Sequence, residues 1–130
     1  MKTRGGIVAL VEDDHSLNHA MARLLSANGF DVRTFDSGEA LLADAAIVEL
    51  DCLVIDIQLP GMSGLQLSQS LSHRGIRTPF IIVTAHDEPE HRHEAMGLGA
   101  ASYLTKPFSR VTFIDAVITA MALPPTAKPS

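Results

Sequence analysis

Side chains able to bind metal or phosphate follow four short apolar runs of this 130-residue chain. They are Glu12, Asp13, Asp14, Asp56, Thr84 and Lys106. Carboxylate oxygens are ligands that suit Mg²⁺, and a lysine ammonium group can reach a carboxylate or a phosphoryl oxygen. If the runs are neighbouring strands of one sheet, their ends deliver acids, a hydroxyl and an amine to one site.

Charge repulsion makes such a gathering of acids costly for the fold alone. Two like charges about 4 Å apart repel by on the order of 4 kcal/mol at an effective dielectric constant near 20. Bringing Glu12, Asp13 and Asp56 together is therefore unfavourable without a cation. The sequence predicts a divalent cation, most suitably Mg²⁺, beside these acids.

Each residue also has a purely structural interpretation. Asp13 or Asp14 could cap the N-terminus of a helix, and Asp56 could be an ordinary turn residue. Thr84 could be a hydroxyl at a strand end, and Lys106 a solvated lysine. Each residue alone is weak evidence for a functional site. The prediction of a site rests on the position that these residues share, directly after the apolar runs.

The segments that must position these residues alternate between strand and helix patterns. Strands are predicted at 7–11, 31–35, 53–55, 80–83 and 101–105. Helical periodicity follows each one: an apolar stripe at 17–25, then segments at 37–47, 65–75, 89–96 and 109–121. The last segment has an apolar stripe that includes Phe113, Val117 and Ile118. Alternation of this kind indicates βαβ units and a parallel sheet, which binds ligands at the carboxyl ends of its strands.

Composition restricts the setting and the partners. The net charge of -5, without a cluster of Lys and Arg, makes this chain alone a poor DNA binder. Cys52 is the only cysteine, so we expect a buried thiol, no internal disulfide and a reducing, cytoplasmic location. We expect no signal peptide and no membrane-spanning segment. Residues 124–130 contain three prolines and are predicted to form a linker after a domain at 1–123, towards an output domain.

Four motifs resemble those of response regulator receiver domains. They are Val11-Glu12-Asp13-Asp14, the segment 56–64, Thr84-Ala85 and Lys106-Pro107-Phe108. The resemblance extends over residues 7–123 and rests on the order and spacing of the full set. It implies an α/β, flavodoxin-like, doubly wound sheet of five parallel strands in the order 2-1-3-4-5, with five helices.

The resemblance also implies a role for each residue of the site. Asp56 would accept a phosphoryl group from a sensor histidine kinase or a small phosphodonor such as acetyl phosphate. Mg²⁺ would be held by Asp13, Asp56 and the backbone carbonyl of Gln58, with Glu12 contributing through a bound water. The chain would then be a phosphoacceptor signalling domain rather than an enzyme.

Further implications concern the phosphoryl group and the switch. Lys106 and Thr84 would bind phosphoryl oxygens, and Tyr103 would swing inward as Thr84 moves; alternatively, Tyr103 only covers the sheet edge. The Lys106–Pro107 peptide bond would be cis. The face formed by the fourth helix, the fifth strand and the fifth helix would be the output and homodimer surface.

Three competing functions differ at identifiable residues. A phosphorylation-independent protein-binding module would not need the intact set of Glu12, Asp13, Asp56, Thr84 and Lys106. A phosphatase of the haloacid dehalogenase type needs an acid two residues after its nucleophile, where this chain has Gln58. A flavodoxin needs a hydroxyl-rich phosphate loop after its first strand, and acids occupy that place here.

Two remaining features concern the output and the histidines. The motifs at 56–64 and 106–108 resemble those of regulators that carry a LuxR-type helix-turn-helix, which implies control of transcription, with DNA contacted only through an output domain. His86, His91 and His93 could suggest a transition-metal site, but residues two apart on a helix do not face each other. We interpret these histidines as part of a solvated face.

Overall fold

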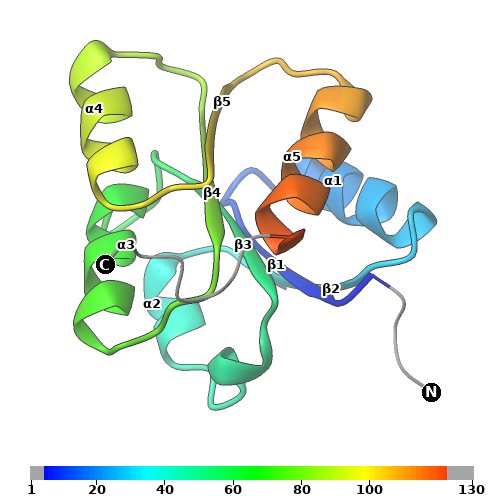
Figure 1. The fold of residues 1–130 in the computed structure, drawn as a ribbon, viewed down its shortest axis with the longest axis horizontal. Helices are drawn as coiled ribbons and strands as arrows, with labels where there is room; N and C mark the ends of the chain where they lie inside the picture. The colour runs from blue at the N-terminus through cyan, green and yellow to red at the C-terminus, as the bar shows by residue number, and fades with distance from the viewer. Residues whose placement is uncertain (1–4, 123–130) are drawn as a thin grey trace.

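Figure 1 shows the computed structural model of the chain, which describes residues 5–122. The predicted linker at 124–130 lies outside the described residues. Five parallel strands form one sheet: β1 (Ile7–Val11), β2 (Asp31–Phe35), β3 (Cys52–Asp56), β4 (Phe80–Thr84) and β5 (Ser102–Thr105). Their order is β2-β1-β3-β4-β5, which confirms the predicted topology.

Five α-helices alternate with the strands. They are α1 (His15–Ala27), α2 (Gly38–Leu42), α3 (Gly64–His73), α4 (Pro89–Gly97) and α5 (Arg110–Ala122), and a short 3₁₀ turn, η1 (Ile47–Glu49), precedes β3. Helices α1 and α5 cover one face of the sheet, while α2, α3 and α4 cover the other (Figure 1). The sheet is therefore buried on both faces, as its β-branched strands predict.

The side chains of the central strands alternate between two apolar layers. One layer joins Val54, Ile81 and Val83 to Leu25 of α1 and Phe113 of α5. The other layer, under α2, α3 and α4, is built from the intervening strand residues and the leucines of α2 and α3: Ala9, Val11, Leu53, Ile55, Ile82, Leu41, Leu65, Leu67 and Leu71. This packing fixes the strand ends relative to one another, so the residues that follow them are held on a rigid edge.

Two details of the helices differ from the predictions. Ile47 was expected in the second helix, but α2 ends at Leu42 and Ile47 lies in η1. The Asp44 carboxylate accepts a hydrogen bond from the Ala46 backbone N–H at 2.9 Å, a local bond that competes with helix continuation. Ile118 was expected on the apolar stripe of the fifth helix, and it is 53% exposed.

Side chains cap the helices that begin near the sheet edge. Asp14 accepts a hydrogen bond from the Leu17 backbone N–H at 3.1 Å and is the N-cap of α1. Ser63 and Gln66 form a capping box at the start of α3, and Ser37 caps α2. Asp14 does the capping, and the neighbouring Asp13 contributes a carboxylate oxygen to the acidic cluster described below.

Candidate phosphoacceptor site

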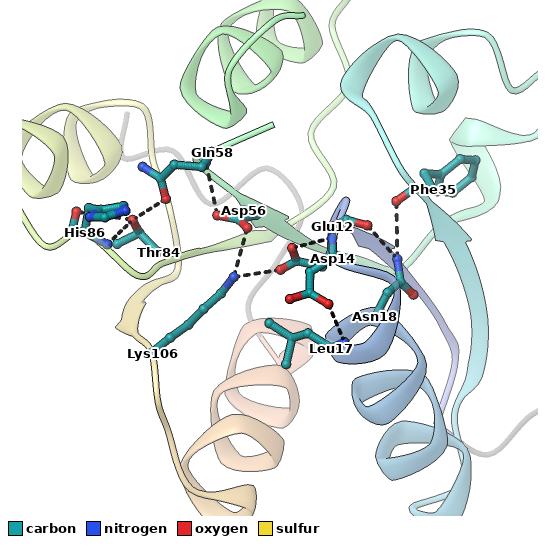
Figure 2. A network of polar contacts seen from close by, with 10 residues as sticks. All are labelled: Glu12, Asp14, Leu17, Asn18, Phe35, Asp56, Gln58, Thr84, His86 and Lys106. Carbon is teal, nitrogen blue, oxygen red and sulfur yellow. Dashed lines mark hydrogen bonds and ion pairs between the residues drawn. The ribbon is translucent and has the colours of Figure 1, made fainter. Parts of the chain in front are cut away.

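Lys106 joins two buried acids at the carboxyl edge of the sheet (Figure 2). Its Nζ donates to Glu12 Oε1 at 2.8 Å and to Asp56 Oδ2 at 2.9 Å. Glu12 follows β1, Asp56 ends β3 and Lys106 follows β5, so the ends of three strands supply side chains to this site. Glu12 and Asp56 are only 2% and 3% exposed, which leaves the lysine as their principal counter-charge.

Glu12, Asp13 and Asp56 form the one candidate metal cluster found among residues 5–122. One carboxylate oxygen from each residue lies within 4.8 Å of the others. Glu12 and Asp56 are buried, whereas Asp13 is exposed and lines an open hollow of the surface. Three carboxylates are a donor set for a hard divalent cation, and an open side leaves room for the waters that Mg²⁺ retains. The residues therefore fit Mg²⁺.

Burial and neighbouring charges leave the pKa values of Glu12 and Lys106 above their ordinary values. Burial raises the pKa of Glu12 above its ordinary value, and the hydrogen bond from Lys106 only partly opposes this rise. Burial also lowers the pKa of Lys106, but its hydrogen bonds to Glu12 and Asp56 outweigh that effect, and the pKa ends above its ordinary value. Lys106 is thus held as a cation between two acids.

Backbone contacts fix the orientation of Glu12. Its side chain accepts from the Asp14 backbone N–H at 3.1 Å, and its carbonyl accepts from Asn18 Nδ2 at 3.0 Å. Asn18 Nδ2 also reaches the Phe35 carbonyl at 3.4 Å, which ties the end of β2 to the end of β1. The sequence reasoning missed Asn18, and its position on the inner face of α1 beside Met21 was the only available signal.

Gly64 lets the first turn of α3 pack against the end of β3. A Cβ at this position would collide with the backbone carbonyl oxygen of Asp56. The Gly64 N–H donates to the Ile57 carbonyl at 2.9 Å and closes the loop between strand and helix. The small residue thus allows the backbone of Asp56 and the helix to approach closely.

Thr84 ends β4, beside Asp56, and its hydroxyl is fully engaged. Oγ1 lies 2.9 Å from Gln58 Oε1 and 3.2 Å from the His86 carbonyl, and it accepts from the His86 N–H at 3.0 Å. The Gln58 backbone N–H donates to Asp56 Oδ1 at 3.1 Å. The predicted Thr84 and Gln58 therefore lie together with Asp56, through a side-chain contact that the sequence did not predict.

Tyr103 lies on the edge strand β5, and its side chain is buried in the apolar layer under α4. It is 8% exposed, and the Arg92 guanidinium of α4 lies 4.4 Å from the centroid of its ring. Burial raises the pKa of Tyr103, as does the charge of nearby Asp87. The Lys106–Pro107 peptide bond next to this strand is cis, the isomer that the resemblance implies.

The histidines do not form a metal centre in the part of the chain that is described. His86 and His93 are exposed, in line with a solvated face. His91 departs from that expectation, because its side chain is only 28% exposed and its Nε2 lies 3.8 Å from Glu88 Oε1. The interpretation of a solvated face therefore holds for two of the three residues.

Comparison with known proteins gives this geometry its context. The profile of the family described as "Response regulator receiver domain" matches residues 8–118. The chain belongs to this family. A receiver domain is a phosphoacceptor module of two-component signalling that partners with histidine kinases, and it is not a classical enzyme.

Curated relatives and solved structures support the assignment. The chain is 35% identical to "Transcriptional regulatory protein TdiR" of Thauera aromatica, over 89% of this chain and 51% of that protein. It is 36% identical to "Transcriptional regulatory protein FixJ" of Rhizobium meliloti, over 85% of this chain and 54% of the relative. The crystal structure titled FIXJ-N superposes with a TM-score of 0.83 at 35% identity, covering 93% of this chain and 95% of the other.

Two further findings concern the extent of the match and the helices. The receiver chain spans about half the length of these curated transcriptional regulators. None of the helices described between residues 5 and 122 is long and apolar enough to cross a membrane.

Proposed function

We propose that this receiver accepts a phosphoryl group on Asp56 from a phosphohistidine of a sensor histidine kinase. The observation that carries the proposal is the pair of hydrogen bonds from Lys106 to Asp56 and Glu12, beside the Asp13 carboxylate. This arrangement combines a nucleophilic oxygen, a fixed cation and a cation-binding cluster at one edge. Phosphoryl transfer depends mainly on such positioning and charge neutralisation.

The transfer step is a displacement at phosphorus. A carboxylate oxygen of Asp56 attacks the phosphorus atom and forms an O–P bond while the P–N bond to the donor histidine breaks. The imidazole leaves with the electron pair of the broken bond and takes up a proton. The product is an acyl phosphate on Asp56.

Glu12, Asp13 and Asp56, with the backbone carbonyl of Gln58, are the residues proposed to hold Mg²⁺. When bound, Mg²⁺ supplies neutralising charge to the phosphoryl oxygens. Lys106, whose pKa stays above its ordinary value, supplies a second positive charge from the protein itself. Its Nζ already contacts Asp56 Oδ2 at 2.9 Å, so a small movement brings it to a phosphoryl oxygen.

Thr84 and Tyr103 are proposed to transmit the conformational change from phosphorylated Asp56 to the rest of the domain. The Thr84 hydroxyl turns to donate to a phosphoryl oxygen, and the packing of Tyr103 responds to this movement. A conformation that offers the phosphoryl group all its partners gains population when the group is present. The stacked Arg92 couples Tyr103 to α4, which makes α4 the nearest element able to report the change.

Phosphorylation by acetyl phosphate with Mg²⁺ tests this function. We expect the intact mass of the parent chain to rise by one phosphoryl group, and Asp56→Asn to abolish the rise. Asp14→Asn is a matched control, because Asn also caps helices and Asp14 serves α1 as its N-cap. An unchanged mass in the parent would instead favour a protein-binding module that works without phosphorylation.

A homodimer through α4, β5 and α5 is proposed as the consequence of phosphorylation. Large apolar side chains that are exposed on these helices include Met96, Val111 and Ile118, at 50%, 69% and 53% exposure. Ile118→Glu should weaken association measured by sedimentation after phosphorylation, whereas Val48→Glu, at an exposed site before β3, should not. Equal association of both variants would contradict this surface.

Control of transcription through a DNA-binding output domain is proposed from the relatives. TdiR and FixJ are both named transcriptional regulatory proteins, and this chain matches about half of each. Residues 1–123 would then be the receiver and 124–130 the start of a linker to the output domain, of the LuxR type that the motifs resemble. The sequence that follows Ser130 in the encoding gene tests this proposal directly.

A further inference from the structure

Gln58 forms hydrogen bonds with both Asp56, the proposed phosphoacceptor, and the hydroxyl of Thr84 (Figure 2). Strand β3 continues beside β4 beyond its last residue, because the Ile57 N–H donates to the Val83 carbonyl at 3.0 Å. This register places Gln58 next to Thr84. The Gln58 backbone N–H donates to Asp56 Oδ1 at 3.1 Å, and its side-chain Oε1 lies 2.9 Å from Thr84 Oγ1.

The Thr84 hydroxyl has one proton to donate, and two acceptors already share it. Gln58 Oε1 at 2.9 Å is nearer than the His86 carbonyl at 3.2 Å, while the His86 N–H occupies a lone pair of Oγ1. A phosphoryl oxygen that needs this proton must therefore displace an existing hydrogen bond.

We propose that Gln58 is a positioning residue that holds Thr84 in the unphosphorylated arrangement by competing with the phosphoryl group for its hydroxyl. The inference rests on the proposed phosphorylation of Asp56. Gln58 thereby biases the switch against the phosphorylated conformation, and the phosphoryl group gains the hydroxyl only when the Gln58 amide releases it. Since the backbone of Gln58 also bonds Asp56, the competitor stands directly beside the nucleophile.

The competing bond can be removed without disturbing the core. Gln58 is an exposed residue and lines an open hollow of about 560 Å³ with Asp13, Pro60 and His91. Gln58→Met keeps the length of the side chain and removes the amide. Thr84→Val keeps the shape of the threonine and removes the hydroxyl, so the two variants and their combination form a double-mutant cycle.

The test measures the affinity of the full chain for beryllofluoride, an analogue of a phosphoryl group on a carboxylate, by titration calorimetry with saturating Mg²⁺. We expect Gln58→Met to bind about fivefold more tightly than the parent, the ratio that corresponds to about 1 kcal/mol for one hydrogen bond. Thr84→Val should bind more weakly than the parent. Adding Gln58→Met to Thr84→Val should leave the affinity of that variant unchanged.

Two results would overturn the inference. Unchanged or weaker affinity of Gln58→Met would show that the contact does not compete. An equal gain from Gln58→Met in the parent and in the Thr84→Val variant would show that Gln58 acts by another route. If the parent chain binds beryllofluoride and Gln58→Met binds it no more tightly, only the competition is refuted. If the parent chain does not bind beryllofluoride, both the proposed function and the competition are refuted.

Discussion

Replacing Lys106 by methionine removes the positive charge between two buried carboxylates. Lys106 Nζ contacts Glu12 and Asp56 at 2.8 and 2.9 Å, and those side chains are only 2% and 4% exposed. Methionine has a similar length, so the main change is the loss of charge and of two hydrogen bonds. The remaining acids lie close together in the same cluster and repel each other.

The structure gives the expected size of this effect. Removing one partner of a buried ion pair typically costs about 3–5 kcal/mol, because a buried charge is left without compensation. The Lys106 side chain is 17% exposed, so solvent already screens part of its interaction, and we expect the lower end of that range. A loss of about 3 kcal/mol lowers the melting temperature of a domain of this size by about 12 °C.

Urea unfolding at neutral pH, followed by circular dichroism, measures the loss. Added Mg²⁺ should stabilise Lys106→Met more than the parent, because the variant cluster has no competing cation and binds Mg²⁺ more tightly. Arg77→Met is a matched control, since it removes one positive charge from an exposed residue and should change stability by less than about 0.5 kcal/mol. Equal stability of Lys106→Met and the parent, or equal gains from Mg²⁺, would refute the reasoning.

Three further predictions concern Glu12, Gly64 and Cys52. Burial raises the pKa of Glu12 in the folded state above its ordinary value of 4.5. Protonated Glu12 therefore stabilises the fold below pH 4.5, and this contribution is lost as the pH rises through the folded-state pKa. The unfolding free energy of the parent should therefore fall relative to Glu12→Gln over that window, and a constant difference would be contrary evidence. Gly64→Ala should destabilise by about 1–3 kcal/mol in urea, because its Cβ meets the Asp56 carbonyl, while Gly97→Ala, with open space around it, should not destabilise. Burial raises the pKa of Cys52 to about 12, so a thiol reagent should label it only when urea unfolds the chain, and rapid labelling of the native protein would disagree.

Much of the fold follows from the periodicity of the sequence. Short β-branched runs predict strands buried on both faces, and the observed order β2-β1-β3-β4-β5 agrees with the resemblance. The end of α2 was predicted wrongly, because Ile47 is apolar and correctly spaced while the bond from Ala46 to Asp44 favours a turn. Ile118 was also misjudged, since hydrophobicity alone does not distinguish a core position from an exposed one, here 53% exposed.

The sequence predicts which residues come together at the site, but not all of the hydrogen bonds between them. Strand ends of a parallel sheet share one edge, which is why Glu12, Asp56 and Lys106 come together as expected. The role of Asn18 was not foreseen, because its spacing from Met21 indicates only that it lies on the inner face of α1 and does not indicate which carbonyls it bonds. The Gln58–Thr84 hydrogen bond depends on the rotamer of an exposed side chain, which periodicity does not determine.

The central claim is that Asp56 receives the phosphoryl group, and reductive trapping tests it most directly. Borohydride cleaves an acyl phosphate and reduces the carboxyl carbon, which leaves homoserine at the modified position. After treatment with acetyl phosphate and Mg²⁺, peptide mass mapping should find this change at Asp56. Homoserine at Asp13 or another aspartate, or no homoserine in a chain that gains phosphate, would contradict the claim.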